Sequence, residues 1–204
     1  MYTGEGKGGP SPSRRESVDL STNNSLSLSK YPLIGYSYNT TTNMYYNQLT
    51  IKSDKLFDYL LDLPHETLPW FEHFGFDAFE IDLSWLDKDA GLAAIHNLYP
   101  IKRLGLLRIP PDSVYDWHKD EYRLSTVNML IKHDHSHSLF AKSKDNYNIN
   151  ITELSYKPYT YYLYNNQEYH SVLNFSKPRY LFSLYFDKEL DYNLVKDILH
   201  PILH

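Results

Sequence analysis

The 204-residue sequence contains no cysteine. It can therefore form neither a disulfide framework nor a thiolate metal site, and any metal that the protein binds must be held by His, Asp or Glu. A chain of this length can bury a sizeable core without such cross-links, so we expect one globular domain.

Long apolar runs are also missing from the sequence. No stretch approaches the roughly 18 apolar residues of a membrane span. The N-terminal segment MYTGEGKGGPSPSRRES lacks the apolar region of a secretory signal. These two absences predict a soluble, intracellular, cytoplasmic protein with no membrane partner.

Positive charge is not in excess. Lys and Arg number 20 against 25 Asp and Glu, which gives a net charge of -5. A nucleic-acid surface normally needs a concentrated basic stripe to neutralise phosphates, so we expect no nucleic-acid partner. The 20 tyrosines can stack on bases, but they also suit a β-rich core whose polar tips reach solvent, and we favour the second interpretation.

The first third of the chain divides into a tail and a helical region. Residues 1–30 are rich in Gly, Ser, Pro and Asn, with too few large apolar side chains to offset the entropy of ordering them. We expect a flexible tail there and a single domain over residues 31–204, with helical support within 53–98. Ser53 is expected to cap a helix that ends before Pro64, and a second helix is expected over 86–98. The first helix would bury four apolar side chains: Leu56, Phe57, Leu60 and Leu61.

The second half of the chain predicts a β core over residues 103–187. Short runs of β-branched and aromatic residues alternate there with Pro, Asp, Asn and Ser. The spacing is typical of an antiparallel sandwich, so the expected fold is mostly β with flanking helices (α+β), a double-stranded β-helix of the jelly-roll or cupin-like kind. A short helix over 192–199 follows. We expect strands at 103–109, 115–120, 124–131, 149–154, 160–164, 170–173 and 179–186.

His118 and Asp120 are the first candidate metal ligands. Side chains alternate across a strand, so residues two apart project to the same side and can reach one ion. A lone His-x-Asp pair is common, and its alternative interpretation is an exposed strand end with a solvated salt bridge.

His170 and Arg179 extend this pattern. If residues 174–177 form a four-residue hairpin loop, Val172 faces Arg179, and His170 shares a face with Arg179 two residues away, or roughly 6.6 Å at about 3.3 Å per residue. Two imidazoles and one carboxylate can hold Fe(II) and leave three positions open. A guanidinium at this spacing suits the far carboxylate of 2-oxoglutarate. The alternatives are a core histidine at 170 and an edge-strand charge at 179.

The polar run from His133 to His137 is a rival metal site, because alternating histidines on a strand can converge. Dense polar runs are more often solvated loops between strands, and we favour that interpretation. The sequence contains no nucleophile elbow, phosphate-binding loop or dinucleotide-binding glycine motif.

Two long segments together resemble a known family. They are RLGLLRIPPDSVYDWHKDEYRLSTVNMLI and YYLYNNQEYHSVLNFSKPRYLFSLYFD, and they resemble the aspartyl/asparaginyl β-hydroxylase branch of the Fe(II)/2-oxoglutarate dioxygenases over residues 100–187. Departures from the family pattern are a long polar segment over 133–148, and Pro111-Asp112 where the family has a Pro-Gly turn.

The resemblance implies a role for each matching residue. His118, Asp120 and His170 would be the catalytic iron ligands, and Arg179 would bind the C5 carboxylate of 2-oxoglutarate. Arg123 would be a second candidate for the carboxylate of the co-substrate or substrate. The resemblance also makes Asn166 a candidate either to orient the turn before His170 or to donate to the substrate, and an ordinary turn residue is its alternative.

The implied activity is hydroxylation of an amino-acid side chain, in a protein or as a free amino acid. Such an enzyme uses Fe(II), takes 2-oxoglutarate and O2 as co-substrates, and releases succinate and CO2. Two alternatives stay open. One is a cupin-like metal enzyme that works without 2-oxoglutarate, and the other is a noncatalytic binding or structural protein on the same scaffold.

Overall fold

The computed structural model describes residues 43–144 and 150–199. The flexible tail expected over 1–30 lies outside these residues, as does the start of the domain expected at 31. Within the described ranges, no helix combines the length and the apolar character needed to cross a membrane.

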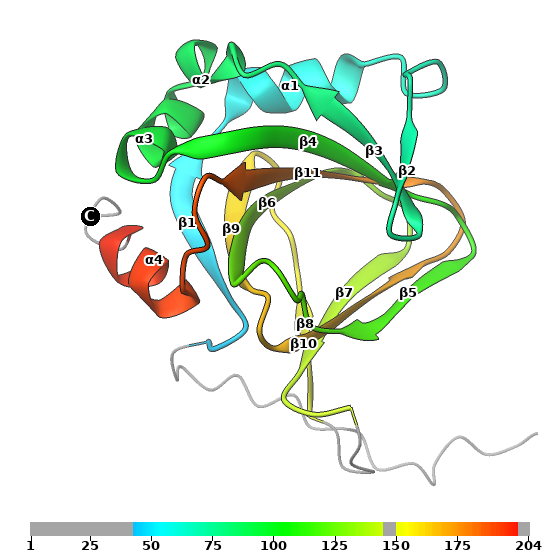
Figure 1. The fold of residues 1–204 in the computed structure, drawn as a ribbon. Coiled ribbons are helices and arrows are strands. Elements are labelled where there is room, and N and C mark those ends of the chain that lie inside the picture. The colour runs from blue at the N-terminus through cyan, green and yellow to red at the C-terminus, as the bar shows by residue number, and fades with distance from the viewer. Residues whose placement is uncertain (1–42, 145–149, 200–204) are drawn as a thin grey trace, which may run out of the picture. The chain divides into compact units, whose positions relative to one another are not determined.

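Two antiparallel sheets form the body of the protein (Figure 1). From β4 to β11 the chain passes repeatedly from one sheet to the other, which is the winding of a double-stranded β-helix and confirms the expected fold class. The larger sheet has the order β1 (Tyr46–Lys52), β9 (Thr160–Asn165), β6 (Ser125–Lys132), β11 (Arg179–Phe186), β4 (Ile101–Ile109), β3 (Phe76–Ile81), β2 (Phe71–His73). The smaller sheet has the order β5 (Ser113–His118), β10 (Tyr169–Asn174), β7 (Ser136–Ala141), β8 (Ile151–Leu154).

The main hydrophobic core lies on the outer face of the larger sheet, under the helices (Figure 1). Because side chains alternate along a strand, β11 sends one set of residues to this core and the other set into the space between the sheets. The core set from β11 is Tyr180, Phe182, Leu184 and Phe186. The helices are α1 (Asp54–Asp62), α2 (Trp85–Lys88), α3 (Ala90–Leu98) and α4 (Tyr192–Leu199).

Asp89 organises the helical region. The single helix expected over 86–98 is two helices, because Asp89 adopts an extended conformation between α2 and α3. Its carboxylate accepts the Leu92 N–H at the start of α3 and the Leu56 N–H at the start of α1. Ser53 stands at the N-cap position of α1, but its hydroxyl donates to Asp89 instead of capping the helix. The expected capping role of Ser53 is therefore wrong, and Asp89 caps both helices.

Several other elements differ from expectation. Leu61 is exposed, so α1 buries three of the four predicted residues. Strand β7 lies in the segment expected to be a polar loop, and β1, β2 and β3 were not expected. The turn between β2 and β3 places Phe74 and Gly75 at positive φ. Strand β5 ends at His118, so Asp120 belongs to the following loop and not to the strand.

Strands β10 and β11 do not form the expected hairpin. Strand β10 pairs with β5 and β7, whereas β11 pairs with β4 and β6 in the other sheet. The four residues between them therefore cross from sheet to sheet. The side-chain amide of Asn174 fixes this crossing by donating to the carbonyls of Ile109, Pro110 and Lys177.

Candidate metal centre

His118 and His170 are brought together by strand pairing. They are opposite each other in the β5–β10 pair, and their ring centroids are 4.1 Å apart. A bulge lies beside them, because four residues of β5, from Tyr115 to His118, span the same length as three of β10, from His170 to Val172. Such a bulge changes the direction in which side chains point. Here Tyr115 and His118 both line the same cavity.

Asp120 completes the cluster from the loop after β5. Its Oδ1 lies 3.5 Å from His118 Nε2 and 3.6 Å from His170 Nε2. The three ligand atoms all lie within 4.8 Å of one another, and within the described ranges this is the one group of His, Asp and Glu side chains able to hold a metal ion. It is the donor set of a facial two-histidine, one-carboxylate site.

The backbone fixes the tautomer of both histidines. His118 Nδ1 lies 2.7 Å from the Asp116 carbonyl, and His170 Nδ1 lies 3.0 Å from the Glu168 carbonyl. A carbonyl only accepts, so each Nδ1 carries the proton and donates. In the neutral rings each Nε2 is left with a free lone pair that faces the carboxylate, which is what metal binding requires.

The residues of the cluster shift the pKa values of Asp120 and His118. Burial acts to raise the pKa of Asp120, but His118, His170 and Arg123 together hold that pKa well below its usual range. Burial acts to lower the pKa of His118, but the Asp120 carboxylate and the Asp116 carbonyl together outweigh burial and raise that pKa. Asp120 is therefore ionised at neutral pH, as a metal ligand must be.

Arg123 and Asn166 both contact Asp120. Arg123 Nη2 lies 2.7 Å from Asp120 Oδ2, and Asn166 Nδ2 donates to the same oxygen at 3.0 Å. Asn166 is buried, and its Oδ1 accepts from the Thr126 hydroxyl. Arg123 also lines the cavity beside Asp120. The expected role of Arg123 toward the carboxylate of the co-substrate or substrate stays a prediction, as do the two roles considered for Asn166.

Arg179 is the most fully buried charged side chain of the described residues, with 1% of its surface exposed. It reaches from β11 across to the smaller sheet, where Nη1 donates to Ser136 Oγ at 2.9 Å and Nη2 donates to Ser138 Oγ at 2.6 Å. Nη2 also donates to the Tyr156 hydroxyl at 3.2 Å, and Nε has no partner.

No carboxylate pairs with Arg179 among residues 43–144 and 150–199. Tyr156 does not supply the missing charge, because burial raises its pKa and keeps the phenol neutral. An unpaired buried charge is costly, so this pocket is suited to an anion that comes from outside the described chain.

The distance from Arg179 to the histidines follows from strand register. Ser138 is opposite Val172, and Phe140 is opposite His170. The guanidinium therefore contacts β7 two residues along from the level of His170, or roughly 6.6 Å at about 3.3 Å per residue. The hairpin that was expected to bring Arg179 to this spacing is absent, and the contact with β7 produces a similar spacing instead.

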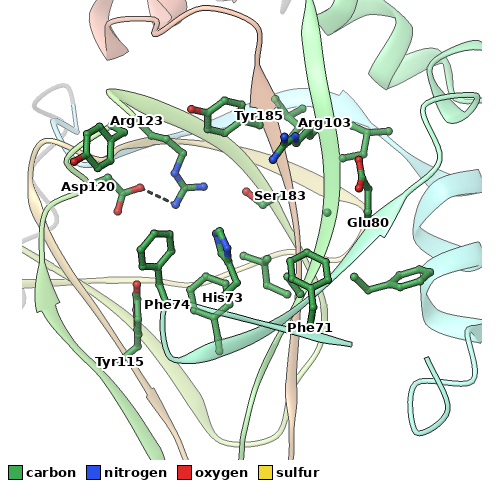
Figure 2. Close-up of a pocket in the computed structure, with 18 of the residues that line it drawn as sticks. Phe71, His73, Phe74, Glu80, Arg103, Tyr115, Asp120, Arg123, Ser183 and Tyr185 are labelled. Atoms are coloured by element: carbon green, nitrogen blue, oxygen red, sulfur yellow. Dashed lines mark ion pairs between the residues drawn. The ribbon is translucent and has the colours of Figure 1, made fainter. Parts of the chain in front are cut away.

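A cavity of about 600 Å³ opens beside His118 and Asp120 (Figure 2). The three most exposed aromatic side chains of the described residues, Phe71, Phe74 and Tyr122, all line it. Arg103 and Glu80 stand at the opposite side of the cavity from Asp120.

The rival site at His133–His137 does not assemble. His137 lies on β7, where it contacts Glu153, and His135 contacts Asp134. None of these side chains joins a group able to hold a metal within the described ranges.

The structure adds Ser136, Ser138 and Tyr156 to the candidate site, none of which was expected. The alternation Ser-His-Ser at 136–138 could have predicted these hydroxyls, because on a strand it places both serines on one face. The polarity of this segment instead favoured a loop.

No protein-family model and no curated protein matches the sequence. Solved structures do resemble it. A prolyl-4-hydroxylase from Pseudomonas putida has 13% identity and a TM-score of 0.49, and the match covers 72% of this chain and 95% of that one. The viral collagen prolyl hydroxylase of Paramecium Bursaria Chlorella virus-1, solved as a 2-oxoglutarate complex, has 14% identity and a TM-score of 0.47, over 70% and 95%.

An oxidoreductase of the 2OG-Fe(II) oxygenase family from Burkholderia pseudomallei has 14% identity and a TM-score of 0.46, over 63% of this chain and 75% of that one. Likeness at this level carries no information on activity or substrate. What the site does is therefore inferred from its own geometry.

Proposed function

We propose that the protein is an Fe(II)- and 2-oxoglutarate-dependent oxygenase that hydroxylates an amino-acid side chain, in a protein or as a free amino acid. One observation carries the proposal. The buried guanidinium of Arg179, which lacks a carboxylate partner in the described chain, lies about two residue rises along β7 from a His-Asp-His cluster.

The residues present fit the metal. His118, Asp120 and His170 offer two imidazole nitrogens and one ionised carboxylate, a set that leaves positions open on Fe(II). When bound, the iron and its co-substrate supply the oxidising chemistry, with release of succinate and CO2.

The residues around Arg179 fit a dicarboxylate. The guanidinium supplies charge and a planar pair of donors, while Ser136, Ser138 and Tyr156 supply hydroxyls around it. One end of 2-oxoglutarate would lie at the metal and the other at Arg179. A cupin-like enzyme that works without 2-oxoglutarate does not account for the buried, unpaired charge of Arg179. A noncatalytic scaffold does not account for the convergence of the three candidate metal ligands.

The cavity at His118 and Asp120 is the proposed substrate site. Its volume and its aromatic lining are typical of a ligand pocket, and it opens at the proposed metal. We include the aspartyl/asparaginyl β-hydroxylase-like branch in this proposal on the strength of the sequence motifs. An amino-acid side chain entering the cavity would present a C–H bond to the metal, with Phe71 and Phe74 contacting the rest of the substrate.

The test is anaerobic titration of the Fe(II)-loaded protein with 2-oxoglutarate. The wild type is expected to develop a visible metal-to-ligand charge-transfer band. In Arg179→Gln, the 2-oxoglutarate concentration that gives half of the maximal band should rise at least about 100-fold, because the substitution removes a buried charge-assisted contact. Tyr156→Phe keeps the packing and removes one hydroxyl, so its half-saturating 2-oxoglutarate concentration should rise roughly 5-fold.

Two results would overturn the proposal. One is the absence of the band in wild-type protein that binds Fe(II), and the other is a band that saturates at the wild-type concentration in both variants. Screening of amino acids and peptides for stimulated succinate release then identifies the substrate.

A further inference from the structure

We infer that Asn166 and Arg123 form a carboxylate clamp, which restricts Asp120 to ligating the metal through one oxygen. This inference rests on the proposed metal site. It assigns Asn166 and Arg123 as positioning residues for a ligand, instead of residues that bind the co-substrate or substrate.

The two oxygens of Asp120 have separate partners. Oδ1 faces the two histidine Nε2 atoms at 3.5 and 3.6 Å. Oδ2 accepts from Asn166 at 3.0 Å and lies 2.7 Å from Arg123 Nη2. Because Oδ2 is occupied by two donors, Oδ1 is the oxygen left for a metal.

A chain of buried hydrogen bonds fixes which way the Asn166 amide points. Asn128 Nδ2 donates to Thr126 Oγ1 at 3.0 Å, and the Thr126 hydroxyl donates to Asn166 Oδ1 at 3.3 Å. With its oxygen engaged in this way, Asn166 must present its NH2 group to Asp120. Asn128, Thr126 and Asn166 are each at most 3% exposed, so water does not compete for these contacts.

The backbone holds the same two segments together. The Asp120 N–H donates to the Asn166 carbonyl at 3.0 Å, and the Asn166 N–H donates to the Leu124 carbonyl at 3.1 Å. Gln167 Nε2 donates to the Asp120 carbonyl at 3.0 Å. The turn after β9 thus fixes the loop after β5, which explains how a ligand outside any strand keeps a defined position.

The clamp has a consequence for the chemistry. A carboxylate that binds through both oxygens occupies two metal positions, whereas this enzyme needs free positions for 2-oxoglutarate and O2. By holding Oδ2 away from the metal, the clamp keeps one of those positions available. Groups that orient a metal ligand in this way typically contribute 10- to 100-fold to metal affinity or activity.

The test uses Co(II) in place of Fe(II), because the visible absorption spectrum of protein-bound Co(II) depends on the ligands around the ion. Asn166→Ala is expected to bind Co(II) about 10- to 100-fold more weakly, and its absorption per bound ion should differ from that of the wild type as Oδ2 turns to the metal. Thr126→Val, which preserves side-chain shape, should shift both quantities in the same direction by a smaller amount.

Asn165→Ala is the matched control. Asn165 precedes Asn166 in the same turn, but its amide NH2 donates to the Met44 carbonyl, its amide oxygen accepts the Gln167 N–H, and neither atom contacts Asp120. It should leave both the affinity and the spectrum at wild-type values.

The possible outcomes separate the clamp from the proposed function. If wild-type protein binds no Co(II), or if His170→Ala binds it as the wild type does, the metal site itself is wrong. If the wild type binds Co(II) through His170 and both Asn166→Ala and Thr126→Val keep the wild-type affinity and spectrum, the clamp alone is overturned. Should Asn166→Ala fail to fold, Thr126→Val decides the question.

Discussion

At the scale of single residues, burial decides the state of each ionisable group. Arg179 keeps a charge in the interior with only hydroxyl partners in the described chain, and Asp120 stays ionised because His118, His170 and Arg123 together outweigh its burial. Both arrangements are costly for folding alone, which is typical of residues kept for a site. His65 shows the opposite case, a buried histidine with a structural role.

His65 gives a prediction for the pH dependence of stability. Burial lowers its pKa, and its ring stacks on Tyr180 while Nε2 donates to the Leu60 carbonyl. A folded-state pKa below the unfolded value of about 6.5 means that protonation favours the unfolded chain. The contribution of His65 is therefore complete above about pH 6.5 and is lost as the pH falls below it.

Thermal unfolding of wild type and His65→Gln between pH 7.5 and 5.5 is the measurement. The wild type should lose more stability over this range than the variant does. An equal loss of stability in the two proteins would show that folding does not lower the pKa of His65.

At the scale of elements, single side chains join segments that are far apart in sequence. Asp89 caps both α1 and α3, and Asn174 fixes the crossing between the two sheets. Gly91 allows α3 to approach β1, since a Cβ there would lie 2.6 Å from the Lys52 carbonyl oxygen. The helices are thereby held to one face of the larger sheet.

Replacement of Asp89 tests this double cap. Asp89→Ala removes the acceptor for two helix N-termini and leaves the buried Ser53 hydroxyl without its partner. We expect the free energy of unfolding to fall by about 1–4 kcal/mol, from two caps of about 0.5–2 kcal/mol each. Urea denaturation measures it, with Asp87→Ala on exposed α2 as the control. A loss no larger than that of the control would show that Asp89 does not stabilise either helix.

At the scale of the whole molecule, the winding of the chain places the site. The two sheets enclose the proposed metal ligands and Arg179, and the β2–β3 turn extends the larger sheet beside the cavity (Figure 2). Phe74 at the tip of this turn is 76% exposed and has a positive φ of 50°, which is unusual for a bulky residue. Such a side chain has little to contribute to folding.

Phe74 is therefore expected to act on substrate and not on stability. Phe74→Ala should change the free energy of unfolding by no more than about 0.5 kcal/mol, as exposed substitutions usually do. It should raise the KM for the substrate and leave substrate-independent succinate release unchanged. Phe175→Ala, also exposed but outside the cavity, is the control. An unchanged KM in Phe74→Ala would remove this turn from the substrate site.

Strand positions were predictable where the pattern is local. The run from Arg179 to Phe186 has the expected bounds, because a short apolar and aromatic run between Pro178 and Asp187 predicts a strand regardless of its partners. Strand β7 was missed because the interior side of its first half is polar, with Ser136 and Ser138 facing Arg179. A polar strand of this kind resembles a loop until its buried partner is known.

The sequence alone determined the fold class and singled out His118, Asp120 and His170 as candidate metal ligands, since strand-forming runs and metal-binding residue types can be recognised in short segments. Only the tertiary structure decided how Arg179 approaches the cluster, because a four-residue connection suits a hairpin and a sheet crossing equally well. It also decided that Asn166 and Arg123 hold Asp120. Those contacts join the turn after β9 to the loop after β5, and such pairings depend on where the sheets bring distant segments together.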